Sequence, residues 1–191
     1  MAETIQKADE KQFRNYKGSK LQTRAETDEY VIEGYFIVFD QETELWTGVF
    51  EKISPNALDG ELNKDVRALI NHDTSLVLGR TTAGTLELKT DDHGLFGTIR
   101  VNPKDTDAVN LYERVKRGDV SQCSFGFTIE KESTEYREDG SAVITIEDLN
   151  LFEVSVCTFP AYEQTGVQAR EKDFKSKAMK RWKAGMKERL S

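Results

Sequence analysis

Cysteine is scarce in this sequence, where Cys123 and Cys157 are the only two among 191 residues. Two cysteines are too few for a disulfide framework, and they lack the paired spacing of a zinc-binding motif. A free buried cysteine usually serves as a small hydrophobic residue. We therefore predict a protein without disulfides or a metal site, and we expect no cofactor.

Long apolar stretches are also missing. No continuous stretch approaches the roughly 20 apolar residues that span a bilayer, and the first thirty residues carry charges where a signal peptide needs its apolar region. No long linker rich in proline and serine divides the chain. We therefore expect a cytosolic protein with one core: a flexible arm over residues 1–25, a globular domain over residues 26–169 and a tail over residues 170–191.

The charges are segregated along the chain. The net charge of −7 combines about +3 in residues 1–25, about −16 in residues 26–169 and about +6 in residues 170–191. An acidic body argues against nucleic-acid binding, which needs clustered Lys and Arg. In the basic tail, apolar residues recur at every fourth position and predict an amphipathic helix. These residues are Phe174, Ala178, Trp182, Met186 and Leu190. Such a helix would pack on the body or dock on an acidic partner.

The central region has the pattern of a β-rich α+β protein. A Ser-Pro pair at residues 54–55 predicts a short helix, and a capping residue at Asp105 or Thr106 with Gly118 as its stop predicts a longer one. Residues 131–141 are rich in charge and are predicted to form a long loop, the charged excursion between two strands. Strands are expected at residues 30–39, 46–53 as the partner of the first, 66–70, 76–78, 84–89, 94–101, 124–130, 142–146 and 150–159.

Two histidines are available for proton transfer near neutral pH, where imidazole titrates. His93 lies in an Asp-Asp-His-Gly turn, which needs no further role to explain it. His72 follows a predicted buried strand, a common place for a catalytic group. An exposed loop histidine is the alternative interpretation of His72.

A candidate nucleophile stands at the start of a predicted strand, in the segment Ser124-Phe125-Gly126-Phe127. Gly126 lets a substrate backbone approach closely because it has no Cβ. Ser121 competes as a turn serine, and Cys123 as a thiol nucleophile. The context lacks the first glycine of the Gly-x-Ser-x-Gly elbow, which argues against an esterase-like hydrolase.

A carboxylate to orient the histidine is suggested by Glu153, within the apolar segment 151–157. A carboxylate there must find a partner or face outward. Side chains of a strand alternate between its two faces, so Glu153 could simply face outward together with Leu151 and Ser155. Asp148 and Asp73 remain alternatives for the same role.

Together, three segments resemble the prohead, or capsid maturation, serine proteases of tailed bacteriophages. They are Asn71-His72-Asp73 followed by Leu78-Gly79-Arg80, then Ser124 to Phe127, then residues 151–161. That family is similar in fold to the herpesvirus assemblins, whose third triad member is a histidine in a segment resembling residues 153–157. The resemblance implies an assemblin-like closed β-barrel of about seven strands with surrounding helices. It also favours Glu153 over Asp148.

The resemblance further implies a Ser-His-Glu endopeptidase that works inside the assembling procapsid, in the host cytoplasm. His72, Ser124 and Glu153 would be its catalytic residues. Its substrates would be the scaffold protein or the scaffold-like arm of the major capsid protein, and also itself. The portal is a further partner to expect, and homodimerisation is implied. A non-catalytic assembly module with the same fold is the alternative. For the oxyanion donors, backbone N–H groups and Arg80 are the candidates.

Overall fold

The computed structural model describes residues 3–5, 11–15, 21–24, 30–159, 171, 174–176 and 179, of which residues 3–5 are described by their backbone alone. In chain order the elements are β1 (Glu3–Ile5), β2 (Gln12–Arg14), β3 (Leu21–Arg24), β4 (Tyr30–Val38), β5 (Thr43–Trp46), β6 (Val49–Ile53), η1 (Pro55–Leu58), η2 (Glu61–Asn63), β7 (Arg67–Ile70), β8 (Asp73–Arg80), η3 (Thr81–Ala83), β9 (Leu86–Thr90), β10 (Gly94–Val101), α1 (Thr106–Arg117), β11 (Gln122–Tyr136) and β12 (Ala142–Cys157). The three η elements are short 3₁₀ turns, so the described part of the chain is β-rich, as predicted.

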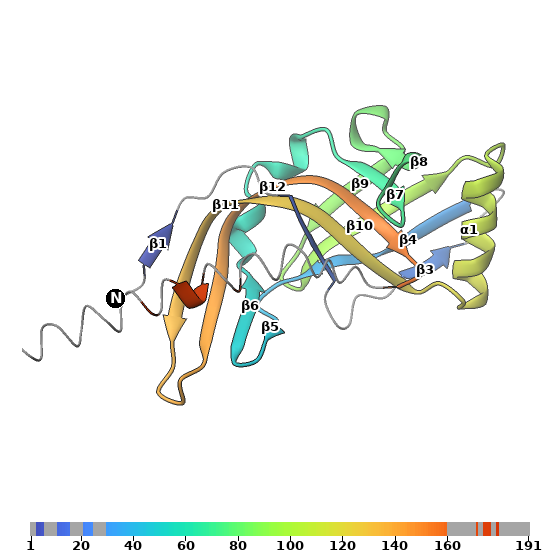
Figure 1. The fold of residues 1–191 in the computed structure, drawn as a ribbon. Coiled ribbons are helices and arrows are strands. Elements are labelled where there is room, and N and C mark those ends of the chain that lie inside the picture. Colours follow the sequence, from blue (N-terminus) through green and yellow to red (C-terminus); the bar gives the residue numbers. More distant parts are fainter. Residues whose placement is uncertain are drawn as a thin grey trace, which may run out of the picture.

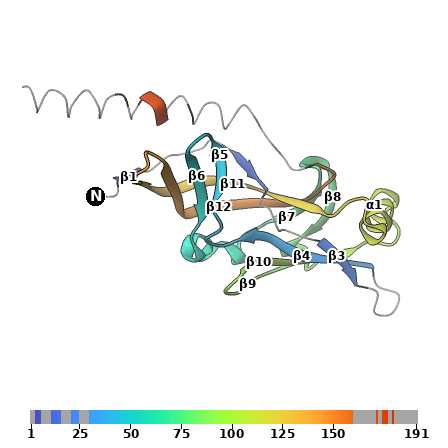
Figure 2. The ribbon, with the colours of Figure 1, turned by 90° about the horizontal axis from the view of Figure 1, so that it is seen from below.

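The strands form two sheets. An eight-stranded sheet follows the order β1-β11-β12-β6-β5, with β2 added to β11, β7 to β12 and β8 to β7, and a four-stranded sheet follows the order β3-β4-β10-β9. Figures 1 and 2 show the two sheets as layers with α1 beside one end. Large side chains that fill the core between them include Phe36, Phe125 and Phe127.

A long antiparallel hairpin, β11–β12, forms the centre of the larger sheet (Figure 1). Its register shifts at three places, one of them between Gly126 and Phe127. Such bulges add local twist and bend a strand. Because of its length, the hairpin pairs with different strands at its two ends: β12 pairs in parallel with β6 near its start and with β7 near its end.

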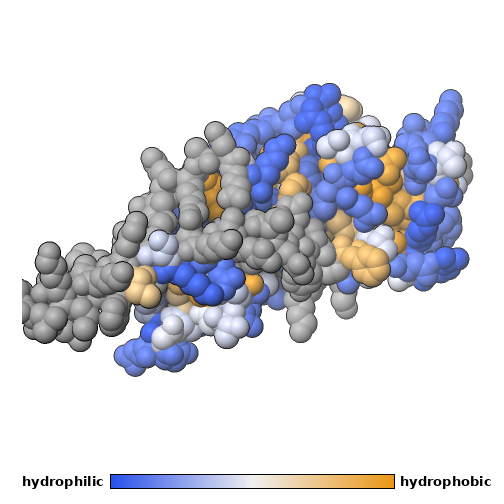
Figure 3. Space-filling view, in the orientation of Figure 1, coloured by the Kyte–Doolittle hydropathy of each residue, from blue (hydrophilic) through white to orange (hydrophobic). Residues whose placement is uncertain are grey.

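Helix α1 has the ends that its sequence predicts. Asp105 accepts hydrogen bonds from the backbone N–H groups of Asp107 and Ala108, and Gly118 ends the helix in the left-handed conformation with φ 87°. The inner face buries Leu111 and Tyr112, while the outer face, at the right of Figure 3, is hydrophilic. Within the part of the chain that the structure describes, no helix is long and apolar enough to cross a bilayer.

Four sequence predictions need correction or completion. The partner predicted for the first strand is wrong, because β6 pairs with β5 and β12, whereas β4 pairs with β3 and β10. The charged excursion is shorter than predicted, because β11 continues to Tyr136 by pairing with the start of β12. For the same reason the last two predicted strands are one continuous strand. Among the described strands the pairing paths of both sheets are open, so the closed barrel of about seven strands is not confirmed.

The predicted arm contains strands that its polar sequence did not suggest. β1 and β2 pair with β11, and β3 pairs with β4. These pairings join the arm to both sheets, while the boundaries at residues 25 and 169 stay predictions. In the predicted tail, Phe174 packs its ring against Trp46 and Tyr136, with centroids 5.8 and 6.0 Å apart. Residues 178, 182, 186 and 190 of the predicted apolar stripe lie outside the described residues.

Candidate active site

His72 stands in the tight turn that joins β7 to β8. The two turn residues, Asn71 and His72, have φ values of 51° and 62°, and the flanking Ile70 and Asp73 are paired. Two positive φ values in a two-residue loop define a type I′ hairpin, and Asn and His tolerate this conformation better than most residues. The predicted strand before His72 is confirmed, and the turn sets the direction in which the imidazole points.

Hydrogen bonds attach this turn to the end of β12. The Asn71 N–H donates to the Val156 carbonyl at 3.0 Å, and the Asn71 side-chain oxygen accepts from the Thr158 N–H at 2.9 Å. The His72 N–H donates to Ser155 Oγ at 3.2 Å. The backbone of His72 is therefore held over β12.

Glu153 meets the histidine from β12. Its side chain is 4% exposed, and its Oε1 lies 2.7 Å from His72 Nδ1. Its Oε2 accepts a hydrogen bond from Ser155 Oγ at 2.5 Å. Because an ionised carboxylate only accepts hydrogen bonds, Nδ1 carries the proton in this contact, and Nε2 is left as the basic nitrogen. This is the orientation that a general base requires.

Gly126 leaves the space that the carboxylate occupies. It is paired with Glu153 across the hairpin, and a Cβ at this position would lie 2.5 Å from Glu153 Oε1 and 2.9 Å from the Phe13 ring. The sequence suggested that this glycine admits a close approach. The structure shows that the approaching groups are a carboxylate and an aromatic ring of the same chain.

Ser124 lies on the same face of the hairpin as Glu153, because cross-strand pairs share a face and Ser124 is opposite Ser155. The residue is fully buried. Its hydroxyl donates a hydrogen bond to the main-chain carbonyl of Arg14 at 2.8 Å. Among the described residues no hydrogen bond joins Ser124 to His72. In the structure His72 contacts Glu153, whereas the Ser124 hydroxyl is hydrogen-bonded to strand β2.

The competing carboxylates have other partners. The Asp73 side chain accepts hydrogen bonds from Ser75 Oγ and N at 2.6 and 2.8 Å, and these bonds lower the pKa of Asp73. Asp148 is exposed and pairs with Lys131 in the hairpin register. Glu153 is the carboxylate on the imidazole, and its burial excludes the outward orientation that alternation allowed.

The remaining sequence candidates lie apart from this contact. Cys123 is buried and its thiol donates to the Tyr35 carbonyl at 3.1 Å. Ser121 is exposed ahead of β11. His93 is exposed in the turn between β9 and β10, with its ring against Tyr35. No group of three or more His, Cys, Asp or Glu residues in the described ranges could hold a metal ion.

Arg80 is engaged elsewhere than at the serine. Its Nε and Nη2 each donate to an oxygen of Asp65 at 2.6 Å. This bidentate contact holds the pKa of Asp65 well below its usual range. An oxyanion role for Arg80 would therefore require it to leave a charge-assisted pair.

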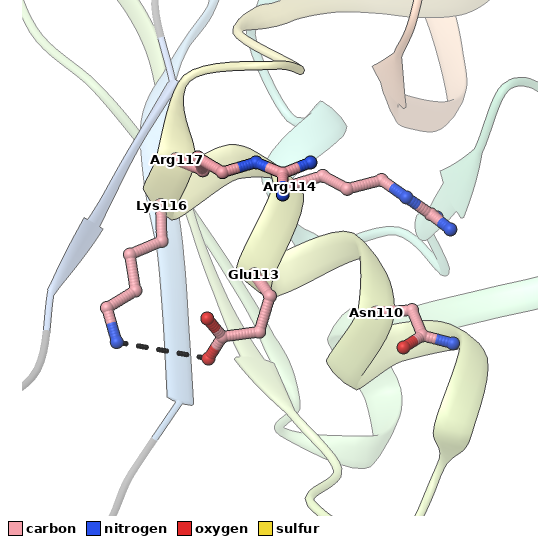
Figure 4. Close-up of a pocket in the computed structure, with 5 residues that line it drawn as sticks. All are labelled: Asn110, Glu113, Arg114, Lys116 and Arg117. Atoms are coloured by element: carbon pink, nitrogen blue, oxygen red, sulfur yellow. Dashed lines mark ion pairs between the residues drawn. The ribbon is translucent and has the colours of Figure 1, made fainter.

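Two further features near the site were not expected. Arg14 reaches it from the predicted arm, where no local pattern marked it. Glu51 is buried on β6 beside Val49 and Ile53, so the sequence did contain a signal, because a carboxylate at an apolar position of a strand needs a partner. A separate surface hollow along α1 shares no residue with the site (Figure 4). It is lined by Asn110, Glu113, Arg114, Lys116 and Arg117.

Cys157 is predicted to be unreactive although its Sγ lies 3.8 Å from His72 Nε2. Burial, together with the negative charge of Glu153, raises the pKa of Cys157 to about 12. A raised thiol pKa keeps the protonated form dominant, so at pH 8 the reactive thiolate is rarer than in the unfolded chain by roughly 10³-fold. Iodoacetamide labelling at pH 8, read by peptide mass spectrometry, should modify Cys157 slowly in the native protein and rapidly in urea. Rapid native labelling would contradict this and favour a thiolate paired with His72.

Comparison with known proteins identifies a family, a named protein and a solved structure to which this chain is similar. Residues 19–180 match the family model described as caudovirus prohead serine protease. Over 140 residues the chain is 31% identical to the protein named prohead protease of Enterobacteria phage HK97, a match that covers 73% of this chain and 59% of that protein. The chain thus spans about three-fifths of that relative's length. Among solved structures, the capsid assembly protease of bacteriophage T4 is similar with a TM-score of 0.45 and 11% identity, covering 82% of this chain and 97% of that one.

Proposed function

The chain belongs to the caudovirus prohead serine protease family, and from that premise we propose that it is a serine endopeptidase of phage procapsid maturation. Its substrates are the scaffold protein or the scaffold-like arm of the major capsid protein, and the chain itself. The observation that carries the proposal is the 2.7 Å contact between His72 Nδ1 and the buried Glu153 carboxylate. A histidine oriented in this way is poised to act as a general base.

In the proposed mechanism Ser124 Oγ attacks the scissile carbonyl carbon while His72 Nε2 accepts the hydroxyl proton. Glu153 accepts the Nδ1–H hydrogen bond and stabilises the imidazolium that forms. His72 then gives the proton to the leaving amine, and water hydrolyses the acyl-enzyme. Ser155 supports the arrangement because its hydroxyl donates to Glu153 and accepts from the His72 N–H.

The site of action that we propose is the assembling procapsid in the host cytoplasm. Confinement with many substrate copies raises their effective concentration, so the enzyme needs little intrinsic affinity for them. The basic tail over residues 170–191 is suited to pairing with acidic scaffold, and removal of the tail would end that contact. Contact with the portal and homodimerisation are further parts of the proposal.

Co-expression tests this function. The full chain would be produced with the major capsid protein and scaffold of the same phage, and intact masses of all products would be measured. We expect shortened capsid or scaffold protein with the wild type and full-length protein with the Ser124→Ala variant. Assembly of capsid shells without any cleavage by the wild type would contradict the proposal and support a non-catalytic assembly module.

A further inference from the structure

Strand β2 lies along the edge of β11 where the proposed nucleophile stands. The two strands are antiparallel, with Arg14 opposite Phe125 and Phe13 opposite Gly126. Addition of an extended segment to a sheet edge is a general mode of peptide recognition, in which main-chain hydrogen bonds give affinity and side-chain pockets give specificity. Ser124 Oγ donates to the Arg14 carbonyl at 2.8 Å. The chain thus presents one of its own peptide carbonyls to its candidate nucleophile.

Phe13, the residue before Arg14, covers the ring of His72. The Phe13 ring packs edge-on against the His72 ring, with centroids 4.6 Å apart and an interplanar angle of 67°. It also meets Phe152 at 6.0 Å and 90°. The His72 side chain is consequently only 18% exposed. β2 therefore covers both the base and the nucleophile, as a bound substrate strand would.

The Arg14 side chain enters a polar pocket on the core side of the hairpin. Its Nε lies 2.7 Å from Glu51 Oε1, and its Nη2 lies 3.4 Å from Glu51 Oε2. The side chains of Arg14 and Glu51 are 8% and 1% exposed. Buried charges need such a partner, because desolvation of a lone charge is costly.

Further contacts surround the guanidinium. Nη1 donates to the Phe13 carbonyl at 2.9 Å and Nη2 donates to Gln12 Oε1 at 3.1 Å. The Phe127 ring centroid is 5.9 Å from the guanidinium carbon. A carboxylate, two neutral acceptors and an aromatic ring form a site that suits a long cationic side chain.

We propose that Glu51 selects a basic residue on the N-terminal side of the scissile bond, and that β2 is the built-in substrate of this pocket, cut between Arg14 and Asn15. This inference rests on the proposed endopeptidase activity and names its specificity. Asn15 follows the presented carbonyl, and its side-chain nitrogen is buried without a hydrogen-bond partner among the described residues. Burial of an unpaired donor costs free energy, so the segment after the cut is favoured to leave.

The proposed cleavage between Arg14 and Asn15 is an ordinary peptide-bond hydrolysis, in which every bond and proton is accounted for. Ser124 turns its proton from the Arg14 carbonyl oxygen to His72 Nε2 and its Oγ bonds to the carbonyl carbon. The C–N bond to Asn15 breaks and the leaving amine takes the proton from His72. Water then gives its proton to His72 and its hydroxyl to the acyl carbon, and Ser124 recovers its proton. The products are an Arg14 carboxylate and an Asn15 amine.

Intact-mass spectrometry of the purified full-length chain tests the proposal, with the amount of cut product followed over time. The expected result is a product that begins at Asn15, absent from Ser124→Ala. Arg14→Ala and Glu51→Gln should each slow this cut by on the order of 10²-fold or more, because the first removes the cation that the pocket holds and the second removes the negative charge that binds it. Arg14→Lys should slow the cut less than Arg14→Ala, since it keeps the positive charge but not the several contacts of the guanidinium.

Matched variants separate the pocket from general effects. Arg24→Ala removes an exposed arginine of the same arm, and Glu44→Gln neutralises an exposed glutamate on the neighbouring strand β5, so neither should change the rate. The double variant Arg14→Ala/Glu51→Gln should cut no more slowly than the worse single variant, because the two side chains act as one pair. Thermal unfolding of each variant identifies any loss of rate that comes from unfolding.

Several outcomes would overturn the proposal. One is cleavage of the Arg14→Ala chain at the wild-type rate. Another is a pocket variant that unfolds at a lower temperature but is cut at the wild-type rate, which would show that the Arg14–Glu51 ion pair is purely structural. A third is a wild-type chain that shortens the capsid protein but stays intact at Arg14, which leaves the proposed function standing. If the wild type cuts neither the capsid protein nor itself, both the specificity and the proposed function fail.

Discussion

Replacement of Ser124 by alanine is expected to lower peptide-bond cleavage by on the order of 10⁶-fold, the scale known for the nucleophile of subtilisin. Without Oγ no acyl-enzyme forms, and His72 has no hydroxyl proton to accept. The fold should survive, because the variant loses one neutral hydrogen bond, to the Arg14 carbonyl, which is worth about 1 kcal/mol. A large loss of rate with little loss of stability distinguishes a nucleophile from a structural serine.

The measurement is the single-turnover rate of cleavage of the capsid or scaffold protein, with thermal unfolding measured in parallel. Ser121→Ala is the matched control, because Ser121 is exposed three positions earlier, and its rate should equal that of the wild type. Wild-type cleavage by the Ser124→Ala protein would remove Ser124 from the mechanism. Loss of cleavage in Ser121→Ala alone would move the nucleophile to the turn.

Glu153→Gln is expected to lower kcat by about 10⁴-fold, the effect known for the corresponding change in a Ser-His-Asp protease. The carboxylate now accepts from two donors, His72 Nδ1–H and the Ser155 hydroxyl. A glutamine has one oxygen and one NH₂ group, so it can accept from only one of these partners and turns a donor toward the other. If the NH₂ group faces His72, the ring must protonate at Nε2 and is no longer a base toward Ser124.

Steady-state kinetics on a peptide or capsid substrate measure this effect, which should appear in kcat while KM changes little. Asp148→Asn is the control, because Asp148 is exposed and lies three positions before Leu151, where the site segment starts. Asp148→Asn should keep the wild-type rate. A large loss in Asp148→Asn, with activity retained in Glu153→Gln, would reverse the assignment of the third residue.

Local features of the fold were accessible from the sequence because neighbouring residues cause them. The cap at Asp105 and the stop at Gly118 define α1 as predicted, and the hairpin before Gly94 joins two strands as predicted. The lengths of β11 and β12 were not accessible. The charged residues where β11 meets β12 have the composition of a loop. Cross-strand pairing nevertheless satisfies their backbone groups, because tertiary context overrides weak local preference.

The candidate site also has a part that the sequence could indicate and a part that only the tertiary structure shows. Residue type and local order offer His72 as a candidate base and Ser124 as a candidate nucleophile beside Ser121 and Cys123, and the strand before His72 forms as predicted. The family resemblance favoured Glu153 over Asp148, but only the distances show which of the three carboxylates, Glu153, Asp73 or Asp148, contacts the imidazole, because their chemistry is the same.

By itself the sequence determines the β-rich class, the capped helix and the three segments that carry the family resemblance, since each depends on residues close together in the chain. Only the tertiary structure decides what lies against these segments. The His72–Glu153 contact joins residues 81 positions apart, the Arg14–Glu51 pair joins residues 37 apart, and Ser124 bonds a carbonyl 110 positions away. Such contacts depend on which distant strands pair, and the residues of one strand do not specify its partner, because strand preference depends on tertiary context.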